Sequence, residues 1–303
     1  MKALFINTNE PACGVHAYGL NLYSVLEPSN SIDWFYCEPL SEPELRMAVE
    51  IMEPDCCVVN YQALIGGFLA GAPFPYMKRS FLVYHDCDID ESRWNGIFFS
   101  DPTMQPKTKW CPIGRPIPEF KVIMQPLGKD GVVIGVHGFL GAWSDQVVKR
   151  VINEFEYATI RLQLPYSKFC DPNGDAARGM ADCCRQMVYG TGVNLEISHE
   201  FLPQPQLLQW LAQNDLNCYI RPVEMNWRGV SSAPDCALAV RKPIAVNSCN
   251  AFRHLHRLSP SICVEDNPLE DIIRNGLSPL VPLYSAWAPE VVRQQVEAVL
   301  MNL

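Results

Sequence analysis

The sequence lacks the short motifs that mark the commonest enzyme classes. It has no Gly-x-Gly-x-x-Gly after a strand pattern, no phosphate-binding loop ending in Gly-Lys-Ser/Thr, no Gly-x-Ser-x-Gly, no His-Glu-x-x-His and no set of protein-kinase motifs. These absences exclude the usual nicotinamide-dependent, ATP-dependent and serine-hydrolase interpretations.

Positive charge and long apolar runs are also scarce. The chain has 24 Lys and Arg against 33 Asp and Glu, a net charge of −9, which argues against broad nucleic-acid binding and against an anionic membrane surface. No run approaches the ~18 apolar residues of a transmembrane helix, and the opening MKALFINTNEP is too short an apolar run for a signal peptide. We expect a soluble protein without a transmembrane segment.

Cysteine is abundant, but its pattern is not that of a disulfide framework or a zinc site. The 13 cysteines are odd in number, no Cys-x-x-Cys occurs, and two pairs are adjacent, Cys56-Cys57 and Cys183-Cys184. Most lie in apolar runs, where a free cysteine behaves as a small hydrophobic residue. The pattern predicts a reducing, cytoplasmic compartment.

The order of elements predicts an α/β fold in two domains. A chain of 303 residues exceeds the usual size of one core. Short apolar strands alternate with amphipathic helices, which indicates parallel sheets covered on both faces. The prolines between 102 and 126 exclude a helix or a central strand there and mark the domain boundary, and the basic residues among them, Arg115 included, are expected on a solvated face.

The stretch from Cys218 to Asn247 reads as strand, polar loop, helix and strand. Ser231 and Ser232 are good N-cap residues, and Asp235 stands three residues after Ser232 as in a capping box. A helix beginning there is expected to point backbone N–H groups and its positive dipole end toward the loop that contains Arg228 and Gly229. The pattern predicts an anion site.

This stretch resembles the donor site of the nucleotide-sugar glycosyltransferases with two facing Rossmann-like domains, the GT-B fold, in particular the retaining family four. The run Asp235 to Ile244, DCALAVRKPI, is similar to the family's Glu-Ala-Leu-Ala-x-Gly-x-Pro-Val-Ile. The family's first acidic residue would fall at Trp227, and the nearest glutamate is Glu224. The resemblance implies that Asp235 holds the ribose hydroxyls and that Arg228, Gly229, Ser231 and Ser232 hold phosphate.

Two further points of resemblance lie in the first half. Cys13-Gly14-Val15-His16 after the first strand is similar to the family's Gly-rich turn, which places Gly14 and His16 in the binding site; His16 by itself is expected on the surface of the helix's first turn. A strand over 80–84 ends in His85-Asp86, where the family has a His that contacts the transferred sugar. The alternative for these two residues is a local pair that stabilises the turn.

The second half departs from the family at its opening strand. Gly138-Phe139-Leu140-Gly141-Ala142-Trp143-Ser144-Asp145 lacks the Arg and Lys that neutralise the diphosphate in the family. We expect Arg161 and Arg228 to substitute for them, with the helix N-terminus at Ser231 supplying backbone donors. The resemblance further places Gly138 in the binding site and Phe201 and Leu202 against the nucleotide base.

Together these features predict a Rossmann-like, acceptor-side domain over 1–126 and a nucleotide-sugar donor domain over 127–303, whose last helix could pack back on the first domain. The implied reaction is glycosyl transfer from a nucleoside-diphosphate sugar to an unknown acceptor, without cofactor or metal and with retention, in which His85 and Arg228 are catalytic. The alternatives are a catalytically degenerate binding protein of the same fold, which the missing Arg and Lys favour, and a nucleotide-sugar epimerase.

Overall fold

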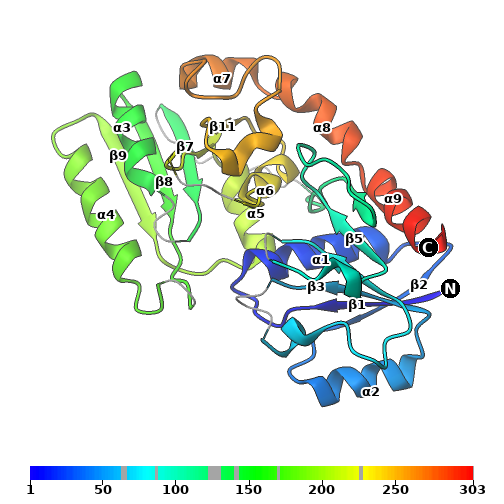
Figure 1. Cartoon of the computed structure of the whole chain (residues 1–303). Helices are drawn as coiled ribbons and strands as arrows, with labels where there is room; N and C mark the ends of the chain where they lie inside the picture. Colours follow the sequence, from blue (N-terminus) through cyan, green and yellow to red (C-terminus); the bar gives the residue numbers. More distant parts are fainter. Residues whose placement is uncertain are drawn as a thin grey trace. The chain divides into compact units, whose positions relative to one another are not determined.

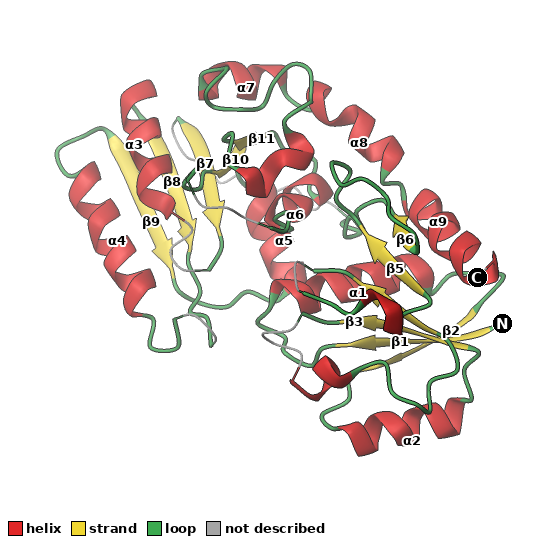
Figure 2. Cartoon of the chain, in the orientation of Figure 1, coloured by secondary structure: helices red, strands yellow, loops and turns green. Residues whose placement is uncertain are grey.

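The computed structural model describes residues 1–62, 67–85, 88–121, 131–139, 143–168, 171–224 and 228–302. The chain divides into two compact units: unit 1 comprises Met1–Ile117 and Leu283–Leu303, and unit 2 comprises Pro118–Pro282. The boundary expected at residue 126 falls in 122–130, outside the described residues. Figures 1 and 2 show the α/β composition of both units.

Unit 1 is built on a six-stranded parallel sheet with the order β2-β1-β3-β4-β5-β6. The elements in chain order are β1 (Lys2–Asn7), α1 (Gly14–Leu26), β2 (Asp33–Cys37), α2 (Glu42–Met52), β3 (Cys56–Asn60), β4 (Ser80–Val83), β5 (Gly96–Phe99), β6 (Trp110–Pro112) and α9 (Pro289–Asn302). The order reverses at β1 and β3, so the carboxyl ends of these two strands form a topological switch point.

Both faces of this sheet are covered, which explains why its central strands β3, β4 and β5 are buried along their whole length. Alternate residues of β1 belong to different cores: Phe5 packs with α1 and α9, and Leu4 packs with α2. The last helix, α9, therefore belongs to unit 1, where its buried face of Val292, Val296 and Leu300 completes the core beside α1.

Unit 2 contains a five-stranded parallel sheet with the order β11-β10-β7-β8-β9. Its elements are β7 (Val132–His137), α3 (Ser144–Glu154), β8 (Ala158–Gln163), α4 (Asp175–Val188), β9 (Val193–Ser198), α5 (Gln204–Ala212), β10 (Leu216–Tyr219), α6 (Ala233–Ala239), β11 (Ile244–Val246), α7 (Leu269–Asn275) and α8 (Val281–Ala286). Here the switch point lies between β7 and β10. The core between the sheet and α3 and α4 is aliphatic.

The strand expected over 80–84 is present as β4, and the strand expected to begin at Cys218 is present as β10. The apolar run over 262–265 also predicts a strand, but this prediction is wrong: the segment makes an isolated parallel bridge between Val246 and Cys263. Among the described residues, no helix is both long and apolar enough to cross a membrane.

Candidate functional sites at the two switch points

The switch point of unit 1 is occupied by two buried asparagines. Asn7 ends β1 and Asn60 ends β3, and the two are direct partners in the strand pairing. Asn60 Nδ2 donates to Asn7 Oδ1 over 2.6 Å. The sequence rule that placed His85 at a strand end would also have found both residues, because they too stand at the carboxyl ends of parallel strands.

Main-chain partners fix the orientation of both amides. Asn7 Oδ1 accepts the Thr8 N–H at 3.0 Å, and Asn7 Nδ2 donates to the His16 carbonyl at 3.1 Å. Asn60 Nδ2 also donates to the Val15 carbonyl at 3.0 Å. A backbone N–H can only donate and a carbonyl can only accept, so neither amide can be flipped.

This orientation determines the tautomer of His85. Its Nε2 lies 2.6 Å from Asn60 Oδ1, which can only accept, so Nε2 carries the hydrogen. Burial, with a further contribution from the Arg115 charge, lowers the pKa of His85 to about 3. His85 is therefore neutral at pH 7, and its Nδ1 can accept but not donate a hydrogen bond. Tyr18 packs edge-on to the ring, with centroids 4.8 Å apart.

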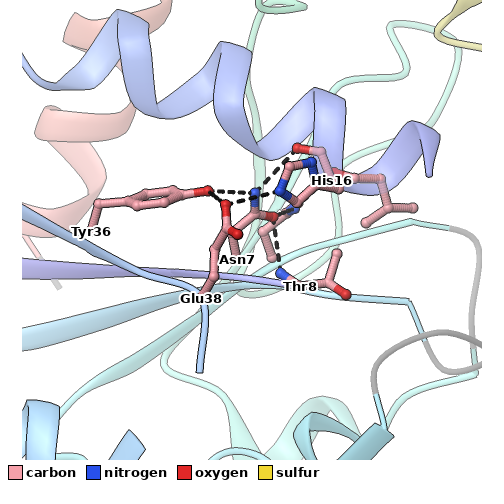
Figure 3. A network of polar contacts seen from close by, with 7 residues as sticks. Asn7, Thr8, His16, Tyr36 and Glu38 are labelled. Atoms are coloured by element: carbon pink, nitrogen blue, oxygen red, sulfur yellow. Dashed lines mark hydrogen bonds and ion pairs between the residues drawn. The ribbon is translucent and has the colours of Figure 1, made fainter. Parts of the chain in front are cut away.

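The network continues from Asn7 to a carboxylate, as Figure 3 shows. Asn7 Nδ2 donates to the Tyr36 hydroxyl over 2.9 Å, and this hydroxyl in turn donates to Glu38 Oε1. Burial, followed by the hydrogen bond to Glu38, raises the pKa of Tyr36 well above its usual value. Glu38 Oε1 also lies 2.8 Å from His16 Nε2, within hydrogen-bond distance. Asn7, Tyr36 and Glu38 were missed by sequence reasoning.

The structure corrects the expected position of His16. The residue is in the first turn of α1 but is only 6% exposed, because its ring turns inward to Glu38, whose side chain is 31% exposed. Gly14, two residues earlier, is exposed at the start of α1. Asp86 lies outside the described residues.

Arg115 was expected on a solvated face and is 2% exposed. Its guanidinium lies 6.0 Å from the centre of the Tyr18 ring, and Nη1 is 3.4 Å from the Ser100 carbonyl oxygen. This cation therefore belongs to the surroundings of His85, whose pKa it lowers.

In unit 2, the expected capping box at the start of α6 is wrong. Ser232 is the N-cap residue but makes no side-chain cap, and Ser231 Oγ accepts the Ala233 N–H instead, at 3.3 Å. The Ser231 N–H donates to the Ala251 carbonyl and the Asp235 N–H to the Ser232 carbonyl. Pro234 has no N–H, so α6, which has seven residues, offers an anion fewer donors than the sequence pattern suggested.

The backbone of the loop before α6 is held by the side chain of Arg253. Arg253 donates to the carbonyl oxygens of Arg228 at 2.6 Å and Gly229 at 3.3 Å. Arg228 and Glu224 are exposed, and residues 225–227 between them lie outside the described residues. Asp235 is 2% exposed, which places its carboxylate inside the fold beside Tyr219, whose pKa its charge helps to raise.

Arg161 is not available as the phosphate ligand that we expected. Its Nη1 donates to Asn214 Oδ1 at 2.7 Å and to the Trp210 carbonyl at 3.1 Å, and its Nη2 donates to Gln213 Oε1 at 3.0 Å. Its guanidinium also packs 4.7 Å from the Trp210 ring centre. These contacts join β8 to α5 and its C-terminal end, so Arg161 is a structural residue.

The switch point of unit 2 brings together the ends of β7 and β10. The Tyr219 hydroxyl is 3.0 Å from His137 Nδ1, and Gly138 follows His137 with a φ of 152°. Burial, with a contribution from the Arg221 charge, lowers the pKa of His137 to about 4. Arg221, two residues beyond β10, is a cation at this point that sequence reasoning did not consider.

The loop after β9 is fixed at its base and open at its tip. His199 Nδ1 lies 2.9 Å from the Leu164 carbonyl oxygen, and Gln163 Nε2 donates to the Glu200 carbonyl. Phe201 is 42% exposed and Leu202 is half-buried, so an apolar surface is presented at the end of the loop. Among the described residues, no three His, Cys, Asp or Glu side chains gather as metal ligands would.

Comparison with known proteins places the chain by fold. Scans of protein-family models and of curated proteins found no significant match. Solved structures are similar over nearly the whole chain. AviGT4, a glycosyltransferase involved in avilamycin A biosynthesis, has a TM-score of 0.62 and 12% identity, over 99% of this chain and 97% of that chain. The trehalose-6-phosphate synthase OtsA has a TM-score of 0.61 and 8% identity, over 100% of this chain and 98% of that chain, and an alpha-glucosyltransferase in complex with UDP-glucose and DNA has a TM-score of 0.54 and 8% identity, over 98% and 93%. The chain has the GT-B glycosyltransferase fold.

Proposed function

We propose that this protein transfers a glycosyl group from a nucleoside-diphosphate sugar to an acceptor. The observation that carries the proposal is the fold: two Rossmann-like units in one chain, with structural neighbours that include an alpha-glucosyltransferase and the glycosyltransferase AviGT4. One of them was solved with UDP-glucose, which favours UDP-sugars as the first donors to test. Unit 2 is the proposed donor unit and unit 1 the proposed acceptor unit.

In unit 2, the proposed donor residues follow β7, β9 and β10 in the chain. On the resemblance to family four, Asp235 is proposed to accept hydrogen bonds from the ribose hydroxyls. The exposed ring of Phe201, with Leu202, is suited to pack against the base. Gly138 lets the backbone approach the ligand without a side chain. The proposed phosphate ligands belong to the loop before α6: Arg228, Gly229, Ser231 and Ser232. Glu224 precedes that loop in the chain.

In unit 1, His85 is proposed to accept a hydrogen bond from a sugar hydroxyl through Nδ1, because Nε2 is committed to Asn60. Its low pKa makes it unsuited to act as a general acid at neutral pH. The partly exposed Glu38, held by Tyr36 and His16, is proposed to bind acceptor hydroxyls together with the turn at Gly14. Metal-independent transfer and retention, which the resemblance to family four implies, belong to this proposal.

The test is a thermal-shift screen of the purified protein against nucleoside diphosphates and their sugars, followed by donor-hydrolysis and transfer assays with and without EDTA. A ligand that binds only the folded state raises its stability by mass action. We expect a shift with one nucleotide that Asp235→Ala abolishes, product formation that His85→Ala and Arg228→Ala reduce, and an NMR coupling that reports retention. Transfer that EDTA abolished would contradict the metal-independent mechanism.

The missing Arg and Lys after β7 favour a second candidate, a GT-B protein that binds its donor without transferring it. Saturable donor binding without any turnover, with the protein fully folded, would select this candidate. Absence of binding to every nucleoside diphosphate would overturn both.

A further inference from the structure

The hydrogen-bond network at the switch point of unit 1 runs in a single direction. His85 Nε2 donates to Asn60 Oδ1 at 2.6 Å, and Asn60 Nδ2 donates to Asn7 Oδ1 at 2.6 Å. Asn7 Nδ2 donates to the Tyr36 hydroxyl at 2.9 Å, and this hydroxyl donates to Glu38 Oε1. Because main-chain partners fix both amides, the direction cannot be reversed. Every hydrogen of the network therefore points toward Glu38, which follows β2.

Both ends of this network are hydrogen-bond acceptors. At one end, His85 is half-buried and neutral at pH 7, and its Nδ1 has no hydrogen because Nε2 carries it. At the other end, Glu38 Oε1 already accepts from the Tyr36 hydroxyl and lies 2.8 Å from His16 Nε2. In the part of the chain that the structure describes, neither His85 Nδ1 nor Glu38 Oε2 has a hydrogen-bond partner. A ligand can satisfy these two atoms only by donating hydrogen.

Glu38 makes this edge of the sheet unfavourable for an anion. Its side chain is 31% exposed, and it stands at the carboxyl end of a parallel strand, where ligands of such sheets bind. In the sequence, no Lys or Arg occurs in the residues that directly follow β1, β2, β3 and β4, which are 8–12, 38–42, 61–65 and 84–88. Arg115, the cation near His85, is 2% exposed. A phosphate or carboxylate would meet in Glu38 Oε2 another atom that can only accept.

We propose that the acceptor is an uncharged compound that presents hydroxyl groups, such as a sugar or a polyol, and that Glu38 excludes acceptors with a phosphate or carboxylate at this position. The assignment rests on the proposed function and names the substrate class of the acceptor unit. Glu38 Oε2 accepts a hydroxyl hydrogen in a charge-assisted hydrogen bond, which is stronger than one between neutral groups. The hydrogen bond from Tyr36 keeps the carboxylate in place for this contact (Figure 3).

The experiment measures transfer to matched acceptors, with the donor that the thermal-shift screen identifies. Glucose is compared with glucose 6-phosphate and with glucuronate, and glycerol is compared with glycerol 3-phosphate. The quantity followed is the ratio of kcat/KM for the uncharged member to kcat/KM for its charged counterpart, which does not depend on the fraction of protein that is folded. We expect this ratio to be on the order of 10 to 100 in the unaltered protein, because the anion leaves Glu38 Oε2 without a donor.

Glu38→Gln tests the carboxylate itself. The amide Oε1 can still accept from Tyr36 and His16, so the amide Nε2 takes the place of the ligand-facing oxygen and donates where that oxygen accepted. We expect the ratio to fall about 10-fold, because the charge-assisted hydrogen bond to a hydroxyl is lost and a phosphate oxygen gains a donor.

The matched control is Glu50→Gln, which removes the same charge from the same unit. Glu50 is exposed near the C-terminal end of α2. That end lies at the opposite edge of the sheet, where Lys2 Nζ donates to the Met52 carbonyl beside the start of β1. The ratio in this variant should equal that of the unaltered protein.

A preference of the unaltered protein for the phosphorylated or carboxylated members overturns the assignment while the proposed function stands. The assignment is also overturned if Glu38→Gln leaves the ratio unchanged, or if no uncharged member is glycosylated although the protein hydrolyses its donor. If the donor is not cleaved with or without any acceptor, the proposed transfer itself fails.

Discussion

Gly19 of α1 faces Asn7 of β1 at a distance that excludes any side chain. A Cβ atom at Gly19 would lie 2.7 Å from Asn7 Cγ and closer still to Asn7 Oδ1 and Asn60 Nδ2. The glycine thus lets the helix approach the two asparagines, which are the central members of the hydrogen-bond network from His85 to Glu38.

Gly19→Ala is expected to lower the free energy of unfolding of unit 1 by about 1–3 kcal/mol, because the asparagines are buried and must shift. The matched control is Gly179→Ala in α4, where a Cβ atom meets nothing within 4 Å and the loss of a helix glycine should stabilise by about 0.5–1 kcal/mol. Urea unfolding measures both. Similar effects of the two substitutions would contradict the close approach.

His85 is expected to remain the neutral Nε2–H tautomer from pH 8 down to pH 5, since its pKa is about 3. Nitrogen-15 NMR of the imidazole distinguishes the tautomers and follows the titration. Asn60→Asp places a carboxylate beside Nε2 and should raise the pKa of His85, because an adjacent negative charge favours the imidazolium. A His85 that titrates near its usual pKa in the unaltered protein would refute this description of the site.

His137 is expected to make unit 2 less stable in acid. Its folded pKa of about 4 lies below the usual 6.5, so between these values the unfolded chain binds a proton that the folded one excludes. Its contribution is fully present above pH 6.5 and is lost as pH falls toward 4, by up to about 3 kcal/mol. His137→Gln should flatten the dependence of the unfolding free energy on pH between 6.5 and 4. If the slope in this variant were as steep as in the unaltered protein, the acid sensitivity would come from another group.

Arg161→Met is expected to destabilise unit 2 by about 2–4 kcal/mol, because it leaves Asn214 and the Trp210 carbonyl without their charged donor. Donor affinity of the folded protein should stay unchanged, because the guanidinium of Arg161 is held by hydrogen bonds between β8 and α5. Chemical unfolding and calorimetry separate the two quantities. Loss of donor affinity with stability intact would restore Arg161 as a phosphate ligand.

The sequence predicted local structure well where local chemistry decides it. The run from Glu42 to Met52, with its acidic first turn, predicts a helix, and α2 covers that range. Ser41 caps the Glu44 N–H, and Glu44 Oε2 accepts the Leu40 N–H. In contrast, the same kind of pattern at Ser232 and Asp235 predicted a side-chain cap that is not formed. There the Asp235 N–H donates to the Ser232 carbonyl, and the Ala251 carbonyl, distant in sequence, accepts the N–H of the preceding Ser231.

The sequence by itself determined the alternation of strands and helices, the two-unit organisation and the strand end at which His85 stands, because periodicity and turn chemistry act over a few residues. Only the tertiary structure decided which charged and polar groups are inside. Arg115 and His16 were expected on the surface and are buried. Arg161 is held by hydrogen bonds to α5 and to the residues after it, and Arg221 packs against the rings of Trp143 and Phe252. The physical reason is strand order: which strands become neighbours at the switch point sets the partners of each side chain, and residues far apart in sequence carry no local signal of that pairing.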